Sequence, residues 1–246
     1  MCTVIVALGV TREAPLVLAH NRDEFLARPS RDVDVWMPDG TTRPIVAGRD
    51  ELSGGTWFAV GPHVTACVTN DRRNGRPAPG IVSRGRLVTD AATATSVDEA
   101  LTRVLAHRAK DVGPFHLLVT DATTMVHVSN AGDVMRTAPV TPGIHVLGNF
   151  DLDDESDPIV QGVHARMRTR SDDSVDGLVH AMQAALRMHG EGAPCLHLGI
   201  YGTRTAGVVA LGGAREHLWT TEGPSCTTPW RDQSAMVVRV RTSTSP

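Results

Sequence analysis

Residues 1–24 read MCTVIVALGVTREAPLVLAHNRDE. Two apolar runs, Thr3–Val10 and Leu16–His20, flank the segment Thr11–Pro15, which contains polar residues and a proline. Apolar runs separated by a short polar segment of this kind are typical of two antiparallel strands joined by a turn. This stretch therefore predicts a hairpin that carries Asn21-Arg22-Asp23-Glu24 back to the beginning of the chain.

The centre of the connecting segment sets the register of this hairpin. A turn centred between residues 12 and 13 places Cys2 opposite Asp23 and Thr3 opposite Arg22. A cation near Cys2 favours the thiolate, and a carboxylate can hold and orient an α-ammonium group. A solvated run of charge that closes a strand is the alternative interpretation, and a register slip of one residue would exchange the side chains that face Cys2.

Cys2 is the second residue, and an initiator methionine is normally removed when the residue after it is small. The mature chain would then begin with a free α-amino group, whose pKa of about 7.7–8.0 suits a general base near neutral pH. The same residue carries a thiol nucleophile, so one residue would supply both parts of a nucleophilic centre. The alternative is a cysteine that merely starts a buried strand.

The composition excludes several classes of protein. The chain has 246 residues, is 41% hydrophobic and has a formal net charge of -3. This length favours a single domain over residues 1–246, and the charge disfavours nucleic acid as a main partner. The longest apolar runs are far shorter than the roughly 20 residues of a membrane-spanning helix. The apolar start lacks a basic region before it, which favours a cytoplasmic protein over a secreted one.

Helix signals come in two pairs along the rest of the chain. We expect helices over residues 83–92 and 96–110, where Ser96 and Glu99 form a capping box. A second pair begins at Ser156-Asp157-Pro158 and at Ser174, with a stop at Gly190. Further strands are expected at 57–60, 64–68, 115–120, 125–129, 144–147, 195–211 and 217–221. Blocks of strands alternating with helix pairs favour an α+β fold with layered sheets over a doubly wound one.

Several motifs in one order resemble the NRDE family, which is the family of the transport and Golgi organisation protein 2. The motifs cover roughly residues 1–209 and are Met1-Cys2-Thr3, Ala19–Phe25 with Arg28-Pro29, Ala47–Asp50, Gly54–Trp57, Val68–Arg72, Ser83–Gly85, Leu147–Asn149 and Tyr201–Arg204. That family in turn looks like the N-terminal nucleophile hydrolases of the choloylglycine hydrolase and penicillin V acylase type. The resemblance implies a four-layer αββα sandwich.

The resemblance also implies roles for individual residues. Cys2 would be nucleophile and base, Asp23 would hold the amino group, and two asparagines would bind the oxyanion and the substrate. The implied catalytic set is Cys2, Arg22, Asp23, Asn70, Asn149 and Arg204. The implied activity is hydrolysis of a linear carbon–nitrogen bond in a small acylated substrate through a thioester. The alternative is a non-catalytic carrier of haem or lipid on the same scaffold, because family members have been linked to haem movement and to lipid and Golgi homeostasis.

Clustered arginines between residues 72 and 86 predict a positive field that receives an anionic group of a ligand. Arg72, Arg84 and Trp57 are the expected substrate-binding residues, with a solvated loop and a structural tryptophan as the alternatives. We expect no metal or other cofactor, because no HExxH motif occurs and Cys195-Leu196-His197 alone is not a metal-site spacing. Cys67, Cys195 and Cys226 are expected to be reduced packing residues. Nothing in the sequence fixes the oligomeric state.

Overall fold

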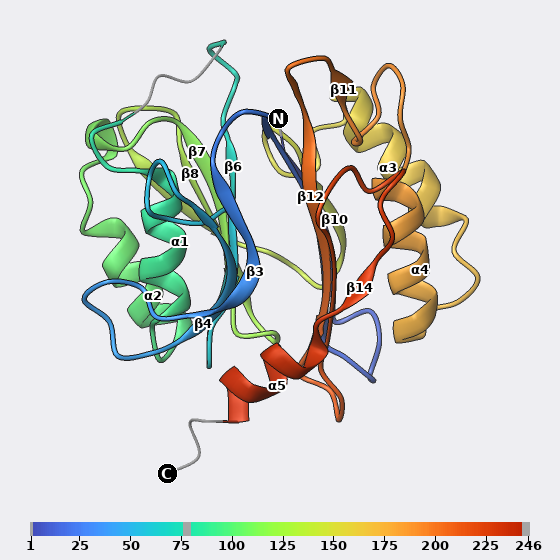
Figure 1. The fold of residues 1–246 in the computed structure, drawn as a ribbon, viewed down its shortest axis with the longest axis horizontal. Helices are drawn as coiled ribbons and strands as arrows, with labels where there is room; N and C mark the ends of the chain where they lie inside the picture. Colours follow the sequence, from blue (N-terminus) through green and yellow to red (C-terminus); the bar gives the residue numbers. More distant parts are fainter. Residues whose placement is uncertain (1, 76–79, 243–246) are drawn as a thin grey trace. The chain divides into compact units, whose positions relative to one another are not determined.

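The computed structural model describes residues 2–75 and 80–242. The chain divides into two units that we describe separately: residues up to 28 with 141–234, and residues 29–140 with those from 235 onward. Each unit contains an antiparallel sheet with a pair of helices against it (Figure 1). The protein thus has a mixed α/β fold with mainly antiparallel sheets, which confirms the α+β expectation. None of the helices within the described residues is long and apolar enough to cross a membrane.

In the sheet of the first unit, β1 lies between two other strands. Its order is β10-β1-β2-β12-β13-β14, and β11 pairs with β12. The strands are β1 (Cys2–Leu8), β2 (Leu16–Phe25), β10 (Gly143–Leu147), β11 (His197–Leu198), β12 (Tyr201–Leu211), β13 (His217–Thr221) and β14 (Arg231–Asp232). The first strand of the chain therefore lies next to both β2 and β10, and all the pairings in this sheet are antiparallel.

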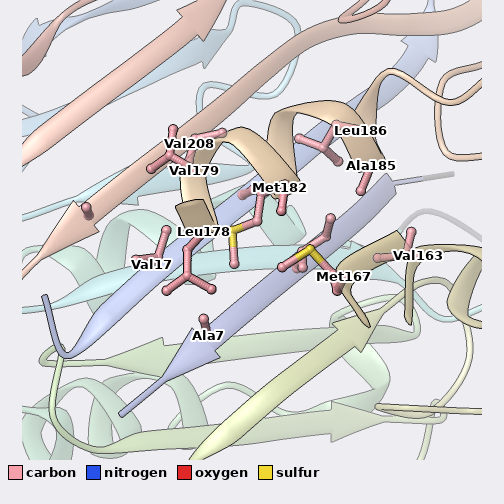
Figure 2. Close-up of a cluster of buried hydrophobic side chains, with 14 of the residues drawn as sticks. Ala7, Val17, Val163, Met167, Leu178, Val179, Met182, Ala185, Leu186 and Val208 are labelled. Carbon is pink, nitrogen blue, oxygen red and sulfur yellow. The ribbon is translucent and has the colours of Figure 1, made fainter. Parts of the chain in front are cut away.

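One face of this sheet packs against α3 (Pro158–Arg168) and α4 (Val175–Leu186). Side chains alternate across a strand, so every second residue of β1 and β2 meets the helices. The strand side chains in the core include Ile5, Ala7 and Val17. Figure 2 shows Leu178 and Met182 of α4 beside Val17 of β2 in this cluster. Burial of these side chains fixes which face of β1 is turned toward the helices.

Local capping residues set the beginnings of both helices, as the sequence predicts. Asp157 caps α3 by accepting a hydrogen bond from the Ile159 N–H, with Pro158 as the first helical residue. Ser174 caps α4 by accepting from the Gly177 N–H. The expected stop at Gly190 is wrong, because α4 ends at Leu186. The Leu186 carbonyl accepts a bond of 2.6 Å from the Ser225 hydroxyl and a bond of 3.0 Å from the Asn21 amide, which terminates the helix there.

The second unit has a sheet in which the strands follow chain order. The strands are β3 (Ser30–Trp36), β4 (Ile45–Asp50), β5 (Phe58–Val60), β6 (Thr65–Asn70), β7 (Phe115–Thr120), β8 (Met125–Asn130) and β9 (Met135–Pro139). The helices α1 (Arg84–Ala92) and α2 (Val97–Leu105) pack against its apolar core. A short 3-10 helix, Ala109–Asp111, follows α2, and α5 (Ser234–Thr242) follows β14.

Two expectations for this unit need correction. The helix predicted over 96–110 ends at Leu105. Ser96 accepts a hydrogen bond from the Glu99 N–H at 3.1 Å, but the Glu99 carboxylate accepts from the N–H of Thr95 rather than from that of Ser96. Only half of the expected capping box therefore forms. Strands β3, β4 and β9 were not expected. Of these, β3 is an edge strand with little burial and three charged residues.

The predicted register of the first hairpin is wrong by one residue. The structure pairs Cys2 with Arg22, and the ladder ends where Leu8 pairs with Leu16. Seven residues, 9–15, make the connection, so its centre is one residue position rather than a point between two. Gly9 adopts a φ of 64° and donates its N–H to the Pro15 carbonyl at 2.7 Å, which closes the turn in this register. Cys2 and Arg22 consequently share the face of the sheet that is turned away from α3 and α4.

Leu178 offers a test of the helix-facing core. Replacing this fully buried residue with alanine removes part of the packing between α4 and the sheet, so Leu178→Ala should reduce the free energy of unfolding by about 2–5 kcal/mol. Urea denaturation followed by circular dichroism measures the change. Leu105→Ala, at an exposed helical leucine, is the matched control and should change the free energy far less. Equal losses in the two variants would contradict this description of the core.

Candidate functional site

Cys2 begins β1 and is partly exposed. Burial of the sulfur raises the pKa of the Cys2 thiol above its ordinary value, and the nearby carboxylate of Asp23 adds to the rise. A hydrogen bond from the backbone of Asp23 and the positive charge of Arg22 act in the opposite direction on this pKa. The expected help from a cation is therefore present, but desolvation is the larger effect. A proton acceptor close to the sulfur is needed to make it a nucleophile near neutral pH.

Arg22 is the cross-strand neighbour of Cys2 and is 3% exposed. It lies in β2, which has β1 on one side and β12 on the other. A guanidinium is always charged, and its field is stronger where water is excluded. Directly opposed residues of an antiparallel pair project to the same side of the sheet. The register therefore fixes a positive charge beside the thiol.

Asp23 follows Arg22 and lies one position beyond the last pair of the β1–β2 ladder, on the side that precedes Cys2. The Thr203 hydroxyl donates a hydrogen bond of 2.6 Å to one Asp23 carboxylate oxygen. The Thr203 oxygen in turn accepts a bond of 2.9 Å from the Leu196 N–H, and the Tyr201 hydroxyl donates to the Asp23 carbonyl at 3.0 Å. This set of bonds fixes the orientation of a carboxylate that is 5% exposed.

Arg204 lies in a β-bulge of β12. Thr203 pairs with Asp23 and Thr205 pairs with Arg22, so Arg204 is the extra residue. Its guanidinium donates to the carbonyl of Phe25 at 3.4 Å and to the carbonyl of Arg28. Arg204 therefore holds the backbone that follows β2 against the bulge beside Asp23.

Asn149 lies two residues beyond Leu147, and Leu147 is the partner of Val4 in the β1–β10 ladder. Cys2 lies two residues before Val4, so Asn149 and Cys2 are at the same end of this strand pair. Asn149 is 3% exposed. The turn that carries it is closed by Asp153, which accepts a hydrogen bond from the Val146 N–H at 2.7 Å and donates its own N–H to the Val146 carbonyl at 2.9 Å.

Asp153 also binds two histidines. Its carboxylate oxygens lie 2.7 Å from Nδ1 of His145 and 3.2 Å from Nε2 of His164. The hydrogen bond to Asp153 raises the pKa of His145. Burial alone would raise the pKa of Asp153, but hydrogen bonds from His145 and Val146 hold it below its ordinary value. An ion pair thus supports the turn that presents Asn149.

Two residues at this end of the sheet were missing from the expected set. Asn21 donates side-chain hydrogen bonds to the carbonyls of Leu186 at 3.0 Å and Pro194 at 3.1 Å. Thr203 orients Asp23, as described above. Both residues belong to motifs of the resembled family, which was the signal available in the sequence. Their roles depend on partners 160 or more positions away in the chain.

Asn70, Trp57, Arg72 and Arg84 belong to the second unit. Asn70 is the last residue of β6, opposite Phe115. The ring of Trp57 packs on Gly48, where a Cβ atom would approach it to 2.4 Å, so Trp57 has a packing role in this unit. One guanidinium nitrogen of Arg84 donates to the Pro114 carbonyl at 3.3 Å.

Arg72 lies two residues after Asn70, at the start of a turn that its carbonyl closes by accepting the Gly75 N–H, and it is partly buried. Within residues 2–75 and 80–242, its Nε atom is buried and has no hydrogen-bond partner. Arg76, which belongs to the same arginine cluster, lies outside the described residues. Among the described residues, Arg72 thus offers a buried donor that no hydrogen bond uses.

The residue between Asn70 and Arg72 anchors this turn. Asp71 accepts hydrogen bonds of 2.9 and 2.6 Å from the guanidinium of Arg73. Nε2 of the buried His116 lies 3.6 Å from the same carboxylate. Burial would raise the pKa of Asp71, but the bonds from Arg73 outweigh burial and hold this pKa below its ordinary value. The buried Asp71 carboxylate therefore fixes the end of β6 through an exposed arginine and a buried histidine.

The fold and the first hairpin define a class: an α/β protein whose first strand begins with a cysteine that pairs with a buried arginine. The family model for Transport and Golgi organisation 2 matches residues 1–222, and the chain belongs to this family. The family resemblance in the sequence is thereby confirmed.

Curated relatives carry the same designation. The chain is 27% identical over 142 residues to the Transport and Golgi organization 2 homolog of Mus musculus. It is 29% identical over 143 residues to the Transport and Golgi organization protein 2 homolog of Homo sapiens. Each match covers 54% of this chain and 50% of the relative, so the chain spans about half the length of the curated relatives it matches.

The His145–Asp153 pair predicts a pH-dependent contribution to stability. A raised histidine pKa stabilises the fold below 6.5, the ordinary value, and the effect is lost as the pH rises through the folded pKa. A lowered aspartate pKa stabilises it above 3.8, and that effect is lost at lower pH. Asp153→Asn should therefore reduce the free energy of unfolding more at pH 5 than at pH 9, measured by urea denaturation.

Asp154→Asn is the matched control, because Asp154 hydrogen-bonds to Ser156 and not to a histidine. Asp154→Asn should lower the free energy of unfolding by similar amounts at pH 5 and pH 9. A loss in Asp153→Asn that does not depend on pH would mean that the pair is not ionised in the folded protein.

The cross-strand pair predicts how alkylation of Cys2 depends on pH. Because the charge of Arg22 lowers the pKa of Cys2, Arg22→Met should shift the midpoint of alkylation to higher pH, whereas Arg22→Lys should shift it less. Limited iodoacetamide labelling at a series of pH values, with peptide mapping, measures the midpoint. Arg28→Met is the control, since Arg28 pairs with Glu24 at 3.7 Å. An unchanged midpoint in Arg22→Met would exclude the electrostatic contact.

Proposed function

We propose that this protein is an N-terminal-cysteine hydrolase that cleaves the carbon–nitrogen bond of a small acylated amide through a thioester. The observation that carries the proposal is the register of the first hairpin. It puts the Cys2 thiol beside the Arg22 guanidinium and puts Asp23 next to the position that precedes Cys2. If Met1 is removed, as the proposal requires, the free α-amino group is that of Cys2 itself and lies at this end of the ladder.

The α-amine is the proposed general base. It takes the proton of the Cys2 thiol, and the sulfur then forms a bond to the carbonyl carbon of the amide. The resulting α-ammonium group is held by the Asp23 carboxylate, which also accepts a hydrogen bond from the Thr203 hydroxyl. Arg22 stabilises the thiolate before attack. The charge of Arg22 opposes the desolvation that raises the pKa of the thiol.

The carbonyl oxygen becomes negatively charged when the sulfur adds. The side-chain amides of Asn149 and Asn70 are the proposed donors to this oxyanion. When the tetrahedral intermediate collapses, the carbon–nitrogen bond breaks and the α-ammonium group protonates the leaving amine. Water, deprotonated by the α-amine, then attacks the thioester and releases the acid and the thiol. Every group in this cycle is a protein group or water, so the reaction needs no metal or other cofactor.

The proposed substrate carries an anionic group. Arg72 has a buried nitrogen that lacks a hydrogen-bond partner within the described residues, and Arg84 adds a second guanidinium in the same unit. A guanidinium binds a carboxylate through two parallel hydrogen bonds. An N-acyl amino acid fits this description, and Trp57 is the proposed apolar contact for it.

The proposal includes a single four-layer αββα domain over residues 1–246 and a cytoplasmic location. Each unit by itself contains a sheet with two helices on one face, which corresponds to half of such a sandwich. The names of the relatives refer to transport and Golgi organisation and specify no reaction.

A substrate screen with matched variants tests the proposal. We expect wild-type protein to hydrolyse a member of a panel of N-acyl amino acids and acylated amines, and intact-mass analysis of the active protein to show a chain that begins at Cys2. Cys2→Ala should abolish turnover without a change in melting temperature. Asp23→Asn should reduce kcat by about 100-fold or more with little effect on KM, because it mispositions the base.

Two results would overturn the proposal. One is turnover that survives in Cys2→Ala. The other is saturable binding of haem or of an acylated compound, unaffected by Cys2→Ala, in a protein that hydrolyses nothing on the panel. The second result would identify a carrier rather than an enzyme.

A further inference from the structure

Three side chains of the first unit that can bind a metal lie close together. None of them takes part in the proposed reaction. Nε2 of His197 lies 3.7 Å from Sγ of Cys195 and 3.0 Å from Sγ of Cys226. All three atoms lie within 4.8 Å of one another. Cys195 is buried, Cys226 is partly exposed and His197 is exposed, so the cluster is open to solvent on one side.

The spacing of these atoms suits one tetrahedral ion. Zinc binds cysteine sulfur at about 2.3 Å and histidine nitrogen at about 2.0 Å, which places tetrahedral ligand atoms roughly 3.5–3.8 Å apart. The separations of 3.7 and 3.0 Å approach these values and need only small side-chain rotations to meet them. Two thiolates and an imidazole are also the donor set that selects zinc over harder cations such as magnesium or calcium.

The backbone already holds the three residues in place. Cys195 donates its N–H to the Met188 carbonyl, and His197 pairs with Gly202 in the β11–β12 ladder. Ser225 anchors the loop before Cys226, because its hydroxyl donates a hydrogen bond of 2.6 Å to the Leu186 carbonyl. The ring of His189 packs edge-on against His197 with 6.3 Å between centroids, which restricts the imidazole.

We propose that Cys195, His197 and Cys226 bind one zinc ion, with solvent as the fourth ligand. The ion joins β11 to the loop that follows β13. It also fixes Leu196, the residue between two of the ligands, and Leu196 donates its N–H to the Thr203 hydroxyl that orients Asp23. The site therefore stabilises the segment that positions this carboxylate. The inference rests on the cluster itself and does not depend on the proposed hydrolase reaction.

The expectation that the sequence holds no metal site was based on local spacing. Cys195 and His197 are two residues apart in a strand-like segment, and Cys226 is 29 residues beyond His197. The three residues therefore do not form a short sequence motif that is typical of a metal site. The long β12–β13 hairpin is what returns the chain to the same point.

Metal analysis of the full-length protein tests the inference. The protein is purified with a reductant, stripped with a chelator and titrated with Zn²⁺ or Co²⁺. We expect one equivalent of zinc per chain, and a cobalt form with the thiolate-to-metal charge-transfer absorption and intense visible bands of a tetrahedral site. Zinc should also raise the melting temperature. Cys226→Ala and His197→Gln should lose the bound zinc, the cobalt spectrum and the thermal shift.

Matched controls separate this site from other thiols and histidines. Cys2→Ala removes the proposed nucleophile and should retain one zinc, as should His180→Gln at an exposed histidine on α4. Substoichiometric zinc in the reduced wild-type protein would overturn the inference, as would zinc that is lost in Cys2→Ala but kept in Cys226→Ala. A Cys195–Cys226 disulfide that, once reduced, leaves a protein unable to bind zinc would overturn it as well.

Discussion

The register of β1 against β2 is the constraint on which the rest of this site depends. Leu8 pairs with Leu16, and the pairing continues without a shift to Cys2 and Arg22. A slip of one residue would turn Ile5 and Ala7 away from α3 and α4 and would bring Cys2 to the helix-facing side. The apolar core of the first unit therefore holds the thiol beside the guanidinium, although neither residue belongs to that core.

Three consecutive residues of β2 use this register for different purposes. Asn21 projects to the helix side and donates to the carbonyl of Leu186, the last residue of α4, and to that of Pro194, which precedes β11. Arg22 projects to the other side, next to Cys2. Asp23 lies at the bulge of β12, where Thr203 binds its carboxylate. Because side chains alternate along a strand, one short motif can bond to the end of α4, place a positive charge beside the thiol and place a carboxylate at the end of β1.

The sequence predicted what local chemistry determines. Ser96 and Asp157 cap their helices where caps were expected, because an N-cap depends on residues within one turn. The helices expected to start at Ser83 and Ser174 begin directly after these residues, which are their N-caps. Features that depend on geometry or on distant partners escaped prediction. The hairpin register depended on the backbone of Gly9, and the partners of Asn21 lie 165 and 173 positions away. The alternation of Val33 and Val35 with aspartates in β3 was available in the sequence, but this edge strand has no continuous apolar run. Of the proposed catalytic residues, the hairpin supplied Cys2, Arg22 and Asp23, whereas Asn70, Asn149 and Arg204 came from the family motifs.

The central claim is that the thiol presented by this register carries an acyl group during turnover. Acid quenching during the steady state with an N-acyl substrate, followed by peptide mapping, tests it most directly. We expect a mass increase equal to the acyl group on the peptide that begins with Cys2, and removal of that group by hydroxylamine as expected for a thioester. An acyl group on any other residue, or hydrolysis with no adduct on Cys2 when thioester breakdown limits the rate, would contradict it.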